Sequence, residues 1–177
     1  MKYTSKEAER KAILNVAYDM AAAARTAPKG RGIDNIETVI LDGEDKETLS
    51  AEMRDIHDKL NGAGPFGRDA GNIDASEAVV LVGVRNAPTG VKSCGLCGLG
   101  DCAGAIKAGA NCAFNITDLG IAVGSAAAVA MDRRIDNRIM FTAGKAAMKL
   151  SIFSEKVKVA YGIPLSASGK SIFFDRG

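Results

Sequence analysis

Residues 78–84, AVVLVGV, form a continuous apolar run that no polar side chain interrupts. A strand with one face in water alternates apolar and polar residues, whereas a strand buried on both faces reads as an unbroken apolar run. The pattern therefore predicts a central strand that is covered on both sides. Glu77 comes immediately before it, and a long segment rich in glycine and cysteine follows it.

The segments on either side of this run predict helices packed on a small sheet. Thr4 and Glu7 have the spacing of a capping box. An apolar stripe with steps of three and four residues follows, and Pro28 ends it. Further strands are expected at residues 38–41 and 157–161, and further helices at residues 46–60, 115–131 and 138–150. This mixed order indicates an α+β fold in a single domain, residues 1–177.

Composition and charge exclude several classes of partner. The chain has 177 residues and a net charge of +2, so it lacks the basic character of proteins that bind nucleic acid or an anionic membrane surface. Aromatic residues make up only 5% of the chain, which also disfavours base stacking. No apolar stretch of about 20 residues is free of charge, so no membrane span is expected. The charged start MKYTSKEAERK is not a secretory signal, and we expect a cytoplasmic protein.

The chain has four cysteines, and they fall close together at Cys94, Cys97, Cys102 and Cys112. Their spacing is Cys-x2-Cys-x4-Cys-x9-Cys, with glycines interleaved throughout residues 90–113, which we call the cysteine segment. In a chain that reads as cytoplasmic, clustered cysteines are metal ligands more often than disulfides. Glycine permits unusual backbone dihedrals and leaves space beside a metal centre. The segment therefore predicts one centre with four thiolate ligands.

The ligand type favours an iron–sulfur cluster of the 4Fe-4S kind. Cysteine thiolates hold such clusters, and a first pair separated by two residues is common among them. The full spacing matches neither the bacterial nor the plant ferredoxin run, so the interpretation rests on ligand chemistry. Zinc is the alternative, although four-cysteine zinc sites normally use two Cys-x2-Cys pairs. A third interpretation is a set of thiols without metal. Cys112 is the weakest candidate ligand, since it starts an apolar helix and could belong to the core.

Four stretches of the chain resemble the uncharacterised prokaryotic proteins called ferredoxin domain-containing proteins. They are TAPKGRGID (residues 26–34), CGLCGLGDC (94–102), DLGIAVGSAAAVA (118–130) and YGIPLSASGKSIFFDR (161–176). The resemblance extends over nearly the whole chain. It implies an iron–sulfur centre at the cysteine segment and no established reaction.

Outside the cysteine segment, the layout resembles the flavin-dependent nitroreductase fold. This implies a small sheet flanked by helices, with the cysteine segment as an insertion, and it implies a homodimer and an FMN site. The loop that carries Ser, Asn and Gln-Pro-Trp in nitroreductases begins here with Ala27-Pro28, and the basic residues Lys29 and Arg31 follow. Any FMN phosphate is therefore expected on Lys29 and Arg31, where their loop meets the helix at residues 115–131.

These observations lead to two functional hypotheses. The first is a 4Fe-4S redox protein that acts in electron transfer or as a small oxidoreductase, with a redox partner protein. The second is a structural zinc or cluster module that serves protein–protein docking without catalysis. A homodimer is expected as well, because the apolar tail SIFF at residues 171–174 would otherwise leave two phenylalanines exposed.

Overall fold

The computed structural model describes residues 1–174 of the protein. Its helices are α1 (Ser5–Thr26), α2 (Gly43–Lys59), α3 (Phe66–Ala75), α4 (Cys102–Lys107), α5 (Ala113–Asp132) and α6 (Phe141–Lys149). Its strands are β1 (Ile36–Asp42), β2 (Ala78–Arg85), β3 (Asp136–Asn137) and β4 (Val157–Ser166). Asp175 and Arg176, which end the last stretch of the family resemblance, lie outside the described residues.

The strands form one antiparallel sheet with the order β1-β2-β4-β3. β2 is a central strand, because it pairs with β1 along one edge and with β4 along the other. Its residues 78–84 are all buried. The apolar run therefore predicted both the position of this strand and its double coverage, and the α+β fold with a small flanked sheet is confirmed.

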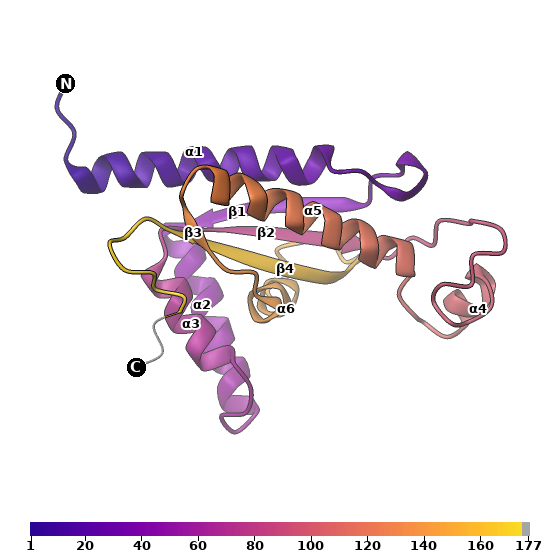
Figure 1. Ribbon diagram of the computed structural model, residues 1–177. Helices are drawn as coiled ribbons and strands as arrows, with labels where there is room; N and C mark the ends of the chain where they lie inside the picture. Colours follow the sequence, from indigo (N-terminus) through magenta and orange to yellow (C-terminus); the bar gives the residue numbers. More distant parts are fainter. Residues whose placement is uncertain (175–177) are drawn as a thin grey trace.

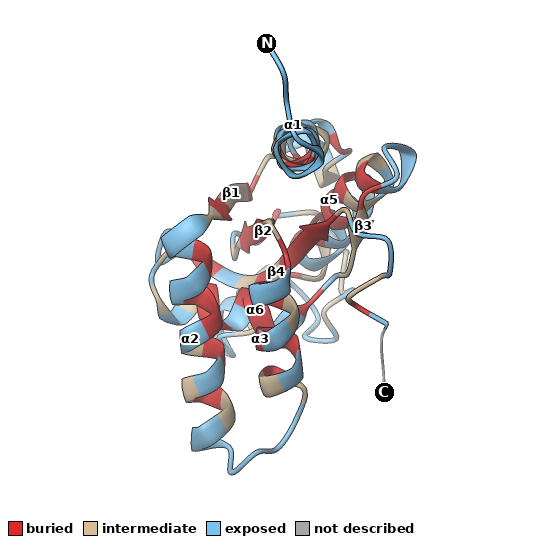
Figure 2. Ribbon diagram, turned by 90° about the vertical axis from the view of Figure 1, so that its left-hand side faces the viewer, coloured by how far each residue is buried: buried red, intermediate tan, exposed pale blue. Residues whose placement is uncertain are grey.

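Two helical layers cover the two faces of the sheet (Figure 1). α1 and α5 lie on one face, where their buried residues form a core with alternate β2 residues such as Val80 and Val82. α2, α3 and α6 lie on the other face, where the core includes Val79 and Leu81. Figure 2 shows the buried sides of both layers turned toward the sheet. The period of two along a strand thus divides one apolar run between two cores.

Local chemistry accounts for the start of α1 and for the close approach of α6 to the sheet. The Thr4 hydroxyl accepts a hydrogen bond from the Glu7 amide, and the Glu7 carboxylate accepts one from the Thr4 amide at 2.7 Å, which completes the predicted capping box. In α6, a Cβ at Gly144 would lie 1.9 Å from the Ala160 carbonyl oxygen. Only glycine therefore lets this helix pack so closely on β4.

The structure corrects the expected elements in two places. The glycine and proline in residues 61–72 predict a loop, but α3 begins at Phe66. Phe66, Ala70 and Ile73 form a buried stripe at helical spacing, and that stripe was the missed signal. The composition after residue 161 predicts an irregular tail, but β4 continues to Ser166 through Pro164. A proline in a strand that pairs on both sides is uncommon, which is why the sequence argued against this assignment.

The C-terminal tail corrects one reason for expecting a homodimer. Phe173 is only 2% exposed and belongs to the core beneath α2, α3 and α6, whereas Phe174 is 65% exposed. One phenylalanine of the pair is therefore buried within its own chain. The tail leaves only Phe174 as a candidate for burial on a partner.

Among the helices of residues 1–174, only α5 has the length and apolar composition that crossing a membrane requires. In this fold it instead covers the sheet, and Leu119, Ala122 and Ala126 are buried against the first core. Its other side is exposed and carries small and apolar residues. The buried apolar residues of α5 thus pack against the sheet, whereas the apolar residues on its other side remain exposed.

Candidate metal centre

The cysteine segment projects from one end of the sheet, beside the C-terminal end of α1 and the N-terminal end of α5 (Figure 1). Two asparagine side chains attach its ends to the rest of the fold. The Asn86 amide group accepts a hydrogen bond from the Cys112 N–H at 3.0 Å and donates one to the Ala110 carbonyl at 3.1 Å. The Asn115 side chain accepts one from the Ala87 N–H at 2.9 Å. These bonds bring the beginning and the end of the segment together.

Within the segment, glycine sets the course of the backbone. Gly95, Gly98 and Gly100 all have positive φ angles, which glycine adopts without the steric cost that a Cβ would add. A Cβ at Gly104 would lie 2.3 Å from the Leu99 carbonyl oxygen, so this position also excludes larger residues. Asp101 caps α4 by accepting a hydrogen bond from the Gly104 N–H at 2.8 Å. The result is a tight coil with little apolar core of its own.

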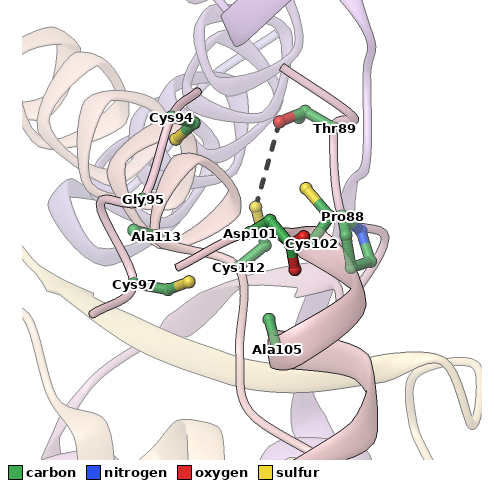
Figure 3. Close-up of a pocket in the computed structure, with 10 residues that line it drawn as sticks. All are labelled: Pro88, Thr89, Cys94, Gly95, Cys97, Asp101, Cys102, Ala105, Cys112 and Ala113. Atoms are coloured by element: carbon green, nitrogen blue, oxygen red, sulfur yellow. Dashed lines mark hydrogen bonds between the residues drawn. The ribbon is translucent and has the colours of Figure 1, made fainter. Parts of the chain in front are cut away.

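This coil brings the four cysteines around one small pocket, with a cavity volume of about 20 Å³ (Figure 3). Cys94, Cys97 and Cys102 are partly exposed, and Cys112 is buried, with 7% of its surface exposed. All four are free thiols. The other lining residues are Pro88, Thr89, Gly95, Asp101, Ala105 and Ala113. The structure thus places the four predicted ligands together, including Cys112.

Cys112 lies in an environment that favours its thiolate. It is the residue that precedes the first turn of α5, where backbone N–H groups point out of the helix. Burial alone would raise the pKa of the Cys112 thiol. The N–H groups of Asn115, Thr89 and Phe114 and the Thr89 hydroxyl outweigh burial, and they hold the pKa below its ordinary value. The same groups would stabilise a metal-bound thiolate.

The geometry of the pocket bears on the metal alternatives. In the described residues 1–174, no three His, Cys, Asp or Glu side chains come close enough to hold a single metal ion. A tetrahedral zinc site needs its sulfurs within about 4 Å of one another, because Zn–S bonds are about 2.3 Å long. The four thiols line one pocket, but within residues 1–174 they do not form a ready-made site for a single ion. Cysteine thiolates are ligands of both iron–sulfur clusters and zinc.

The structure gives Lys29 and Arg31 partners within the protein. The Lys29 ammonium donates to the carbonyl oxygens of Ala24, at 2.9 Å, and Arg25, and so binds the C-terminal end of α1. The Arg31 guanidinium donates to the Thr89 carbonyl oxygen at 2.7 Å. The two cationic groups therefore point to different places, and Arg31 lies next to the cysteine segment. Their role as flavin contacts stays a prediction.

The junction of the basic loop with α5 exists, as expected, but its contacts are specific. The Gly30 N–H donates to the Asp118 carboxylate at 2.9 Å. A Cβ at Gly30 would lie 2.9 Å from the ring of Phe114, so this ring packs directly on the loop. Asp118 is 3% exposed, and its other carboxylate oxygen has no hydrogen-bond partner among the described residues. The Gly30 N–H, which a phosphate at this position would use, thus already donates to the buried Asp118 carboxylate.

Sequence reasoning missed four residues that shape this site: Thr89, Asn86, Asn115 and Asp118. The last two are polar residues on the buried side of a helix that is otherwise apolar, and that contrast was a readable signal. Asn86 follows the central strand directly, where the chain must turn. Thr89 had no distinguishing signal, because its contact with Cys112 depends on chain positions 23 residues apart.

Known proteins resemble this chain in sequence over its whole length and in structure over most of it. The family described as "Uncharacterized protein containing a ferredoxin domain (DUF2148)" matches residues 108–176. An uncharacterised protein of Archaeoglobus fulgidus is 40% identical over 99% of this chain and 98% of its own length. At this identity and coverage the two proteins belong to one family.

Solved structures with the same fold are nitroreductases and related flavoproteins. A putative NADH dehydrogenase/NAD(P)H nitroreductase of Bacteroides thetaiotaomicron gives a TM-score of 0.59 at 13% identity, over 88% of this chain and 74% of its own. A putative nitroreductase of Desulfovibrio desulfuricans in complex with FMN gives 0.59 at 12% identity, over 89% and 75%. A BluB-like flavoprotein of Clostridium difficile gives 0.55 at 14% identity, over 96% and 87%. At these identities the likeness shows the fold alone.

Proposed function

The chain belongs to the family of uncharacterised proteins that contain a ferredoxin domain, and we propose that Cys94, Cys97, Cys102 and Cys112 hold a 4Fe-4S cluster that carries electrons. The observation that supports this most is that all four thiols line a single pocket. A redox protein agrees with both the family description and the nitroreductase-like fold. A structural zinc module is the alternative.

The residues of this chain would contribute in three ways. The four thiolates would bind the cluster, which when bound supplies reversible one-electron chemistry. The N–H groups of Thr89, Phe114 and Asn115 would stabilise negative charge at the Cys112 sulfur. Asn86 would hold the backbone at Cys112 in place through the N–H bond at 3.0 Å.

A redox partner protein would dock at the exposed rim of the cysteine segment. Leu96, Leu99 and Ile106 expose 67%, 39% and 66% of their surface. Three exposed aliphatic side chains in one short segment are more than chance surface residues, since large apolar side chains in contact with water favour burial on a partner. The free thiols suit a reducing, cytoplasmic setting.

The test is anaerobic purification followed by absorption spectroscopy and metal analysis. We expect a brown protein with a broad band near about 400 nm and roughly four iron and four sulfide per chain. Ala103→Ser is the matched control for cysteine substitutions, since it adds a hydroxyl beside Cys102 and removes no thiol. A colourless protein with about one zinc per chain would support the structural module instead.

We also propose that the protein is a homodimer that uses the exposed side of α5. Gly120 and Gly124 lie on this side, and a Cβ at either would meet nothing within 4 Å. Glycine inside a helix costs about 1 kcal/mol relative to alanine, and the packing of this chain gives no reason for it. Ile121 and Met131 are exposed on the same helix, and no charged residue lies between Asp118 and Asp132.

A charged side chain on this surface tests the dimer. Gly124→Arg leaves the core untouched because the position is open, so we expect a folded monomer by light scattering where the wild type is a dimer. Ala51→Arg, at an exposed position on α2, is the control and should remain dimeric. A monomeric wild-type protein at micromolar concentration contradicts the proposal.

Flavin fits the fold but not the contacts at the expected phosphate position. The Asp118 carboxylate accepts from Gly30 there, and a phosphate beside a buried carboxylate would be repelled. The Lys29 ammonium is also bound to the C-terminal end of α1. We therefore assign no step to FMN. Titration with FMN, followed by fluorescence quenching in wild type, Lys29→Ala and Arg31→Ala, tests this directly, and tight binding lost in both variants would restore the flavin site.

A further inference from the structure

Arg31 has a backbone conformation that needs an explanation. Its φ angle is +59°, in the left-handed region that bulky side chains avoid, and Gly30 and Gly32 stand on either side of it. A glycine at position 31 would adopt this conformation without strain. Strained residues of this kind cluster at functional sites, where the side chain justifies the cost. The contacts of the Arg31 side chain therefore bear on its role.

The Arg31 side chain leads to Cys112 through one residue. Its guanidinium donates to the Thr89 carbonyl oxygen at 2.7 Å. Thr89 is 6% exposed, and its hydroxyl contacts the Cys112 sulfur at 4.0 Å (Figure 3). Thr89 thus faces the thiol with its hydroxyl, while Arg31 binds its carbonyl oxygen.

The turn that carries Arg31 is itself fixed against the helix that follows Cys112. Gly30 donates its N–H to Asp118 at 2.9 Å, and the Phe114 ring packs on the same glycine. Asp118 and Phe114 both belong to α5. The Cys112 thiol is therefore held between α5 on one side and Thr89 on the other, and the turn at residues 30–32 contacts both.

We propose that Arg31 is a positioning residue for Cys112, which holds Thr89 against the Cys112 sulfur and keeps a positive charge beside the metal centre. This proposal rests on the proposed function for its electrostatic part only. The mechanical part, in which Arg31 restrains Thr89, belongs to the protein with or without a cluster. Two measurements separate the parts.

The first measurement uses the protein without metal and follows hydrogen exchange of the amides in residues 86–93 by mass spectrometry. Arg31→Met keeps the length of the side chain and removes its donors and its charge. We expect exchange in this segment to rise about tenfold, as for the loss of a hydrogen bond from a charged donor. Arg31→Lys should remain near the wild type. Unchanged exchange in Arg31→Met overturns the proposal.

Arg134 provides a matched control. Its φ angle is also +59°, and it lies in the turn after α5, at the opposite end of that helix from Cys112. Arg134→Met should leave exchange in residues 86–93 unchanged, and an equal rise in this variant would contradict a specific role of Arg31. Where Arg31→Met does not fold, Arg31→Gly replaces it, because glycine suits the left-handed backbone and still removes the side chain.

The second measurement is the midpoint potential of the cluster in the metal-loaded protein. A nearby positive charge favours the reduced, more negative state. Arg31→Met should therefore shift the potential to a more negative value, while Arg31→Lys and Arg134→Met stay near the wild type. An unshifted potential in Arg31→Met overturns the electrostatic part. A wild-type protein that binds no cluster contradicts the proposed function alone, and the exchange experiment still decides whether Arg31 restrains Thr89.

Discussion

The central strand β2 and the cysteine segment follow each other in the chain, yet they are held in opposite ways. β2 is buried on both faces and paired along both edges, so burial of its side chains sets its conformation. The cysteine segment is largely exposed, and glycines and the two anchors Asn86 and Asn115 set its course. Its four thiols line one shared pocket. On the proposed function, the bound cluster would take the place of a core there.

Removal of a single thiol should therefore have its largest effect in the cysteine segment and a small effect on the sheet and its flanking helices. We expect Cys94→Ser, Cys97→Ser and Cys102→Ser each to abolish the absorption near about 400 nm, because a cluster requires all its thiolates. Thermal unfolding of the apoprotein should be unchanged within a few degrees. A variant that keeps full absorption would remove that cysteine from the ligand set, and Ala103→Ser should behave as wild type.

Two leucines, one in each region, test the comparison by stability. Leu81 is completely buried in β2, and Leu96 is 67% exposed between Cys94 and Cys97. Leu81→Ala should lower the free energy of unfolding by about 2–5 kcal/mol, because it removes buried surface and leaves a cavity. Leu96→Ala should change it by less than about 0.5 kcal/mol. Urea unfolding of the metal-free protein measures both, and equal losses would mean that the segment has a core of its own.

Loss of the Asn86 anchor should loosen the segment alone. Asn86→Ala removes the acceptor for the Cys112 N–H and the donor to Ala110, at a local cost of about 1–3 kcal/mol. Trypsin cleavage after Lys92 and Lys107 should then become roughly tenfold faster in the apoprotein, since cleavage follows the population of open segment. Asn15→Ala, exposed on α1, is the control. Unchanged cleavage would assign the restraint to other contacts.

The smallest expected effect is a pH dependence of stability due to Asp34, which follows the loop that carries Lys29 and Arg31. Burial alone would raise the pKa of Asp34, but hydrogen bonds from Arg25 and the Ile36 N–H outweigh it and hold this pKa below its ordinary value. A lowered pKa contributes stability above the ordinary pKa, and this contribution disappears as pH falls through the folded value. Because both side chains are partly exposed, we expect the contribution to stay under about 1 kcal/mol.

Asp34→Asn should therefore destabilise the protein slightly at pH 7 and progressively less as the pH falls below about 4. Urea unfolding at several pH values measures the difference. In an Arg25→Gln background, the substitution should have less effect, because the partner is already gone. A difference that grows toward acid pH would contradict the assigned sign.

The sequence predicted the sheet and most of its flanking helices well, because buried faces produce periodic patterns of apolar residues. The apolar run at residues 78–84, the capping box at Thr4 and the apolar helix near residues 115–131 all appear in the structure. α3 was missed because Gly64, Pro65 and Gly67 masked a short buried stripe. The extension of β4 was missed because Pro164 is a poor strand residue, and its place depends on pairing with β2 and β3.

The four cysteines that line the candidate pocket could be picked out from the sequence, whereas the residues that support them could not. Four cysteines at close spacing are evident in the sequence. The contacts of Cys112 with Thr89 and Asn86 are not, because they join positions more than 20 residues apart in the chain. Lys29 and Arg31 look equivalent in sequence, but one binds the end of α1 and the other binds Thr89. That difference depends on the turn at Arg31, which composition does not encode.

Reversible reduction of the anaerobically prepared protein tests the central claim most directly. One equivalent of dithionite per cluster should bleach the band near about 400 nm, and a mild oxidant should restore it without loss of iron. This result would establish a redox-active cluster in the pocket of Cys94, Cys97, Cys102 and Cys112. A colourless protein with one zinc, or a cluster band that neither bleaches nor recovers, would contradict it and favour a structural metal module.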